Sequence, residues 1–119
     1  MYRLIRASWV GIMLAAVSAP ANAQAVLVAS VPAAGTKVSV GDFAFHLRFN
    51  GLIDHEQSRL TLMHPDGSAE HLVIAEVGPP QVVSSIARLT EGAYVLHWEA
   101  MQVGGHITSG SLSFTAGAQ

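Results

Sequence analysis

The stretch FAFHLRF, residues 43–49, alternates apolar and polar side chains with a period of two. In an extended strand this period places the three phenylalanines and Leu47 on one face and the polar residues on the other. The same alternation recurs in residues 93–101, where three large apolar side chains share a face. The two stretches therefore predict strands that bury one face in a core and expose the other to water.

Shorter segments repeat the pattern and are separated by turn residues. They predict further strands at residues 26–31, 58–63, 70–76, 82–88 and 110–115. The apolar run 26–31 indicates a strand that is covered on both sides or lies at a sheet edge. The turn sequence PDG at residues 65–67 predicts a hairpin over residues 60–76. About seven strands without a helix predict an all-β, antiparallel two-sheet sandwich of immunoglobulin-like, Greek-key form.

The first 23 residues have the pattern of a secretory signal peptide. Two arginines precede an apolar core, residues 9–17, which is too short to span a bilayer of about 30 Å as a helix. The sequence Ala-Asn-Ala at residues 21–23 supplies a small-x-small cleavage site. We expect cleavage to leave a single exported domain, residues 24–119, that begins at Gln24.

The expected mature domain is acidic and contains no cysteine. Without Arg3 and Arg6 it has four Lys and Arg residues against eight Asp and Glu, a net charge of −4. Nucleic-acid binding depends on basic clusters, so we expect no nucleic-acid partner. The absence of cysteine removes disulfides and thiolate metal sites. No apolar run in the mature part reaches the roughly 18 residues of a membrane-spanning helix, and we expect a monomer without a membrane span.

Histidine is the chemically informative residue of this sequence. Nucleophile elbows, phosphate-binding loops, dinucleotide fingerprints and zinc-protease helices are absent from it, so we expect no enzymatic activity. Imidazole and thioether groups are good ligands for Cu(II) and Cu(I), respectively, and two methionines, Met63 and Met101, accompany the histidines. The composition is thus compatible with copper handling. The histidines are His46, His55, His64, His71, His97 and His106.

These histidines differ in the sequence that surrounds them. His46 and His97 are expected on the exposed faces of strands, where a single histidine is most often an ordinary surface residue. His55 lies in a polar loop between two acidic residues, which either donate ligands or form a solvated acidic loop. His71 lies near Met63 or on the opposite sheet face, according to the hairpin register. His106 differs, because it follows two glycines that permit an unusual loop conformation and precedes an expected Ser-Gly-Ser turn.

The segment LTEGAYVLHWEAMQVGGHITSGSLSFTAG, residues 89–117, resembles the end of CopC-type periplasmic copper-resistance domains. The start, LVASVPAAG at residues 27–35, is similar to the opening strand and turn of that family. The stretches LRFNG at 47–51 and SRLTL at 58–62 are similar to two central strands, so the resemblance covers the mature chain and implies a copper-binding β-sandwich. The residues that fit the family's C-terminal pattern are Gly92, Tyr94, Trp98, Gly105, His106, Ser109, Gly110 and Phe114.

The resemblance also implies where Cu(II) binds. In the family the ion is held at one end of the sandwich by an N-terminal histidine with its amine and by the Asp and His of an Asp-x-His loop, with a loop Glu nearby. These positions correspond here to Gln24, Gly104, His106 and Gly51, so His106 alone matches. A Gln24 terminus can cyclise to pyroglutamate, and the family's methionine-rich Cu(I) loop is absent. The histidines that could substitute as ligands are His46, His55 and His97.

Two functions follow from the sequence. In the first, the protein binds copper, as Cu(II) rather than Cu(I), and buffers or delivers it in the periplasm, with an inner-membrane copper transporter of the CopD type as a partner. In the second, the domain has lost metal binding and serves as a non-catalytic interaction or structural module. The departures at Gln24, Gly51 and Gly104 favour the second function, and the family resemblance with the histidine content favours the first.

Overall fold

The computed structural model of the protein describes residues 25–118. The expected signal peptide, residues 1–23, and Gln24 lie outside the described residues. Within the described range no helix is long and apolar enough to cross a membrane. The elements there are β1 (Leu27–Val31), β2 (Lys37–Val38), β3 (Gly41–Phe49), the short 3-10 helix η3 (His55–Gln57), β4 (Arg59–Met63), β5 (Ala69–Leu72), β6 (Val82–Leu89), β7 (Gly92–Met101) and β8 (Ile107–Ala116).

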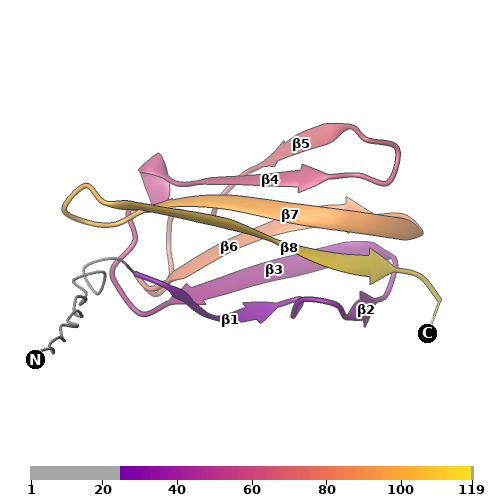
Figure 1. Cartoon of the computed structure of the whole chain (residues 1–119), viewed down its shortest axis with the longest axis horizontal. Coiled ribbons are helices and arrows are strands. Elements are labelled where there is room, and N and C mark those ends of the chain that lie inside the picture. The colour runs from indigo at the N-terminus through magenta and orange to yellow at the C-terminus, as the bar shows by residue number, and fades with distance from the viewer. Residues whose placement is uncertain (1–24, 119) are drawn as a thin grey trace, which may run out of the picture.

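The strands form two facing sheets (Figure 1). The smaller sheet has the order β1-β3-β6, and the larger sheet has the order β2-β8-β7-β4-β5. The chain passes from one sheet to the other at every connection except those between β4 and β5 and between β7 and β8. The predicted two-sheet, immunoglobulin-like sandwich is therefore confirmed.

The core consists of the alternating residues that the sequence pattern singled out. In β3, Phe45, Leu47 and Phe49 are buried, while His46 and Arg48 between them are exposed. The strand β7 repeats this alternation along its length. The buried faces of the two sheets meet between the layers, so the polar faces of both sheets remain on the outside of the sandwich.

A buried tyrosine holds the connection between the two sheets at the β6–β7 turn. The hydroxyl of Tyr94 donates to Thr90 O at 2.9 Å and accepts from Thr90 N–H at 2.9 Å. The Tyr94 ring stacks on Phe114, with 5.4 Å between ring centroids and 9° between ring planes. This arrangement is the tyrosine corner of immunoglobulin-like sandwiches.

Tyr94→Phe is expected to lower the free energy of unfolding by about 1–3 kcal/mol, because it leaves two polar backbone groups of Thr90 without their partner. Urea denaturation followed by tryptophan fluorescence measures this change. Thr90→Ala is the control, because it removes the side-chain methyl and hydroxyl of an exposed residue, the hydroxyl being 3.3 Å from the tyrosine oxygen, and keeps both backbone hydrogen bonds. Equal losses in the two variants would contradict the role assigned to the backbone bonds.

Two segments differ from the sequence prediction in extent or pairing. A two-residue strand, β2, adds an eighth strand and runs parallel to β8, so the larger sheet is mixed and not wholly antiparallel. The strand β5 ends at Leu72, four residues earlier than predicted. The chain beyond it turns toward β6, where Ala75 N–H donates to Ser84 O at 2.9 Å and Ser85 Oγ donates to Val73 O.

Two further segments depart from their expected local structure. The strand β8 begins at Ile107, so Ser109, Gly110 and Ser111 lie within a strand and do not form a turn. Gly110 is required there by a close contact, because an added Cβ would lie 2.5 Å from the ring of Trp98, its cross-strand neighbour. The strand β1 is a sheet edge and mostly exposed, so the expectation of cover on both sides is wrong and the edge alternative holds.

Candidate metal-binding site

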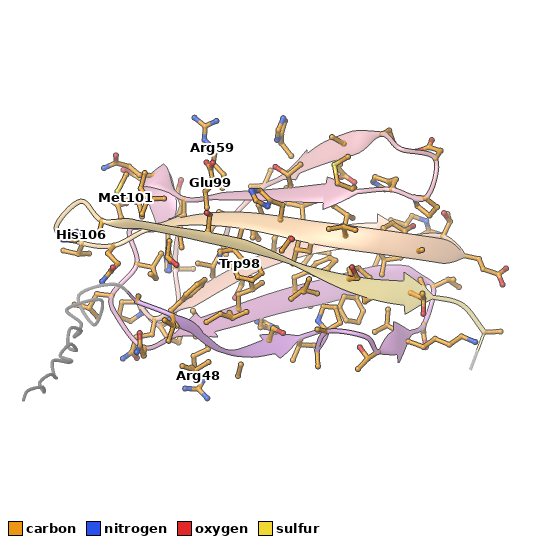
Figure 2. The ribbon with its side chains drawn as sticks, in the orientation of Figure 1. Arg48, Arg59, Trp98, Glu99, Met101 and His106 are labelled. Atoms are coloured by element: carbon orange, nitrogen blue, oxygen red, sulfur yellow. The ribbon has the colours of Figure 1, made fainter. Side chains whose placement is uncertain are left out.

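The loop between β7 and β8 places His106 at one end of the sandwich (Figure 2). Gln102 N–H donates to His106 O at 2.6 Å, and Gly105 N–H donates to Gln102 O at 2.9 Å. Gly104 and Gly105 have φ angles of 113° and 102°, which residues with a side chain rarely adopt. The glycine pair therefore allows a tight loop, and His106 is exposed at its end.

The N-terminal segment is attached to the same end of the sandwich. Ala25 N–H donates to the side-chain Oε1 of Gln102 at 2.8 Å, and Val26 N–H donates to Asn50 Oδ1 at 2.8 Å. Ala25 is 2% exposed. One glutamine side chain thus connects the start of the described chain to the loop that carries His106. Gln24 itself lies outside the described residues.

The other two positions that the resemblance assigns to copper carry no donor side chain. A Cβ added at Gly51 would lie 3.1 Å from Ala25 Cβ and 3.4 Å from Gln102 Nε2, so a larger residue would press on the N-terminal segment. Gly104 has open space around it but a positive φ. Within residues 25–118, no three His, Cys, Asp or Glu side chains gather closely enough to hold a metal ion. A copper site at this end therefore does not consist of three such side chains from the described residues.

His55 lies in η3, which hydrogen bonds tie to this end of the molecule. Asp54 N–H donates to Met101 O at 2.7 Å. The carboxylate of Asp54 is engaged locally, because Oδ1 accepts from Glu56 N–H and Oδ2 from Gln57 Nε2, both at 3.1 Å. Asp54 is thus the N-cap of η3. Nε2 of His55 is buried and has no hydrogen-bond partner among the described residues, which is unusual for a buried polar atom.

His46 and His97 do not join His106. Both are exposed strand residues, as the sequence predicts, but they lie in different sheets, His46 in β3 and His97 in β7. Arg48 shares the exposed face of β3 with His46. In Figure 2, Arg48 projects from one outer side of the sandwich and Arg59 projects from the opposite side. The substitute ligands that the sequence suggests are therefore divided between the two outer faces and the loop end.

His64 is part of a polar cluster at the tip of the β4–β5 hairpin. Its Nε2 lies 2.8 Å from Glu70 Oε1. At the same tip, hydrogen bonds from the hydroxyl and backbone amide of Ser68 lower the pKa of Asp66. These hydrogen bonds are made within the hairpin turn itself. The hairpin tip lies at the end of the sandwich opposite the β7–β8 loop that carries His106 (Figure 1).

The observed hairpin register determines the position of His71. His71 is opposite Thr61, and Met63 is opposite Ala69, so Met63 and His71 share the outer sheet face as diagonal neighbours. Nδ1 of His71 lies 3.3 Å from Thr61 Oγ1. His71 also lines a hollow of about 400 Å³ together with His55.

The sequence profile of the CopC domain matches residues 27–117. This chain belongs to the CopC family. Among solved structures it is similar to CopC from Methylosinus trichosporium OB3b, with 24% identity over 78% of this chain and 93% of that one and a TM-score of 0.69. It is also similar to PcoC, a methionine-rich copper resistance protein from Escherichia coli, with 24% identity over 80% of this chain and all of that one and a TM-score of 0.64. No curated protein matches the chain.

Within this CopC domain, the residue that sequence reasoning missed is Gln102. It links the N-terminal segment to the His106 loop across 77 positions of sequence. A glutamine before a glycine pair carries no local signal of such a contact. The distinctive residues nearby, Gly104, Gly105 and His106, were found because their types alone imply a special loop.

Proposed function

We propose that the mature domain, residues 24–119, is exported to the periplasm, binds Cu(II) there, and buffers it or delivers it to a partner. Membership of the CopC family, the signal-peptide pattern and the number of histidines support this proposal. The expected partner is an inner-membrane copper transporter of the CopD type. The role is binding and not catalysis.

The observation that carries this proposal is the position of His106. Its ring is exposed on a loop that Gln102 joins to Ala25, so an imidazole and the start of the described chain belong to one end of the fold. A single imidazole does not supply the tetragonal nitrogen and oxygen environment that Cu(II) prefers. The terminal amine of Gln24, amide oxygens, water and His55 are the donors that would complete it. Exposed, exchangeable ligands suit a protein that must also release its copper.

Removal of the His106 imidazole tests this function. We expect His106→Ala to weaken Cu(II) binding at the loop end at least about tenfold, because the proposed site loses its one matching side-chain ligand. Titration of the purified mature domain, followed by d–d absorption and electron paramagnetic resonance, measures the change. His46→Ala, an exposed histidine on a sheet face, is the control. An unchanged spectrum and affinity in His106→Ala would contradict the proposed site.

A second function, that of a CopC domain without metal, is favoured by Gly51 and Gly104, which lack the side chains of a copper site. It predicts no sub-micromolar copper binding. Mass spectrometry of the exported protein, prepared with added copper and with a chelator, would distinguish the two functions. The same spectrum shows whether the chain begins at Gln24 and whether that residue has become pyroglutamate, which would remove the amine as a ligand.

A further inference from the structure

Two histidines lie in one row across the outer face of the larger sheet. Thr61 in β4 is opposite His71 in β5 on one side and opposite His97 in β7 on the other. Both histidines are exposed, and Thr61 between them is half-buried. Directly opposite side chains in antiparallel strands project from the same face. Two imidazoles therefore stand on either side of one threonine hydroxyl.

The hydroxyl of Thr61 orients the ring of His71. Nδ1 of His71 lies 3.3 Å from Thr61 Oγ1, so the ring leans over β4, which is the strand between the two histidines. When the hydroxyl donates to Nδ1, this nitrogen carries the lone pair that a metal ion requires, and it faces β4, beyond which His97 lies. The ring of His97 forms no hydrogen bond with any other described residue and is available as a second ligand.

The spacing of the strands suits a shared ion. Adjacent strands are about 4.8 Å apart, so the Cα atoms of His71 and His97 are separated by about 10 Å. Two imidazole side chains that lean toward each other across this distance can bind one ion through metal–nitrogen bonds of about 2 Å. Glu99, two residues beyond His97 on the same face, is directly opposite Arg59, so a carboxylate and a guanidinium both lie beside the row.

We propose that His71 and His97 bind one divalent late transition-metal ion on the outer face of the larger sheet. Imidazole suits Cu(II), Ni(II) and Zn(II), and Cu(II) binds such nitrogen donors most tightly. Water fills the remaining coordination positions. This site does not depend on the loop-end site, because His97 precedes Met101 by four residues, or about 14 Å along β7, and the His106 loop lies beyond Met101.

Zinc and copper titrations of the mature domain, read by NMR of the histidine rings, test the site. In the unaltered protein, Zn(II) is expected to shift, and Cu(II) to broaden, the ring signals of His71 and His97 before those of His46. We expect His71→Ala and His97→Ala each to weaken this binding at least about tenfold, because a single remaining imidazole no longer chelates. Thr61→Val, which keeps the β-branched shape and removes the orienting hydroxyl, is expected to weaken it about tenfold.

His46→Ala is the matched control. His46 is also an exposed strand histidine, and it is bonded to one cross-strand hydroxyl, Ser84 Oγ at 3.0 Å, but its other row neighbour is Val31 and not a histidine. His46→Ala and His106→Ala are expected to leave the affinity at the sheet within about twofold. A urea unfolding curve for each variant shows that the fold is retained.

Two results would overturn the proposal. The first is an unchanged affinity in both His71→Ala and His97→Ala. The second is a loss confined to one of these variants, since two imidazoles would then not share an ion. If that loss occurs in His71→Ala and is shared by His55→Ala, the ion lies in the hollow between η3 and β5. Neither an unchanged affinity nor a loss confined to His97→Ala bears on the loop-end site, whose test is His106→Ala.

Discussion

Phe45→Ala is expected to lower the free energy of unfolding by about 3–5 kcal/mol, the usual cost of deleting a buried aromatic ring. Phe45 is fully buried in β3. Its ring meets Phe43 edge-on at 5.1 Å and Phe114 of the opposite sheet at 5.9 Å between centroids. Loss of the ring removes contacts within one sheet and between the two sheets. Domains of this size are stable by only about 5–15 kcal/mol, so the variant is expected to be close to unfolding.

Urea denaturation followed by Trp98 fluorescence measures this loss, because Trp98 is the only tryptophan in residues 24–119. Ile86→Ala is the control. Ile86 lies on the neighbouring strand β6 but is 69% exposed, so its truncation is expected to change stability by no more than about 0.5 kcal/mol. Comparable losses in the two variants would show that the core does not lie between the sheets at Phe45.

Gly110→Val is expected to destabilise the domain by about 1–3 kcal/mol or more through overpacking. An added Cβ at this position would lie 2.5 Å from Cζ2 and 2.9 Å from Cη2 of the Trp98 ring. The ring is 9% exposed and packs edge-on against Phe49 of the opposite sheet, at 6.5 Å between centroids, so it has little room to move. Valine favours strands, so the expected loss comes from the contact and not from strand propensity.

Ser111→Val is the matched control for this substitution. Ser111 is the next residue of β8 and is exposed on the outer face of the sheet. Valine there gains the same strand propensity without meeting the Trp98 ring, so stability is expected to change by no more than about 0.5 kcal/mol. Urea unfolding curves of the two variants measure their free energies of unfolding. A Gly110→Val domain as stable as Ser111→Val would contradict the close packing of Trp98 on the glycine.

The sheet faces could be predicted because they depend on local alternation. The pattern of residues 43–49 alone assigns His46 and Arg48 to water, and the structure agrees. The register between strands could not be predicted in the same way, since it depends on contacts that are distant in sequence. The pairing of Thr61 with both His71 and His97 is such a case. The two-residue strand β2 is another, because two residues carry no period.

The end of the sandwich that carries His106 shows the same contrast between local and long-range features. His106 and its glycine pair were found from residue type and order. The attachment of Ala25 to Gln102 could not be found, because a side-chain amide has no preference for one distant backbone N–H over another before the chain folds. Nε2 of His55 is buried without a hydrogen-bond partner among the described residues, and this burial results from the packing around η3. The sequence of the acidic loop does not predict it.

The outer strands of the two sheets differ in how well they resist pairing with another chain. β2 and β5 are two and four residues long, β5 exposes Glu70, and residues 73–75 run along part of the free side of β6. Short, charged or covered edges are poor templates for aggregation. β1 is longer than β2 and β5 and exposes valines, although its pairing with β3 is irregular between Leu27 and Ala29 and Pro32 ends the run. Self-association of this protein through strand addition should therefore begin at β1.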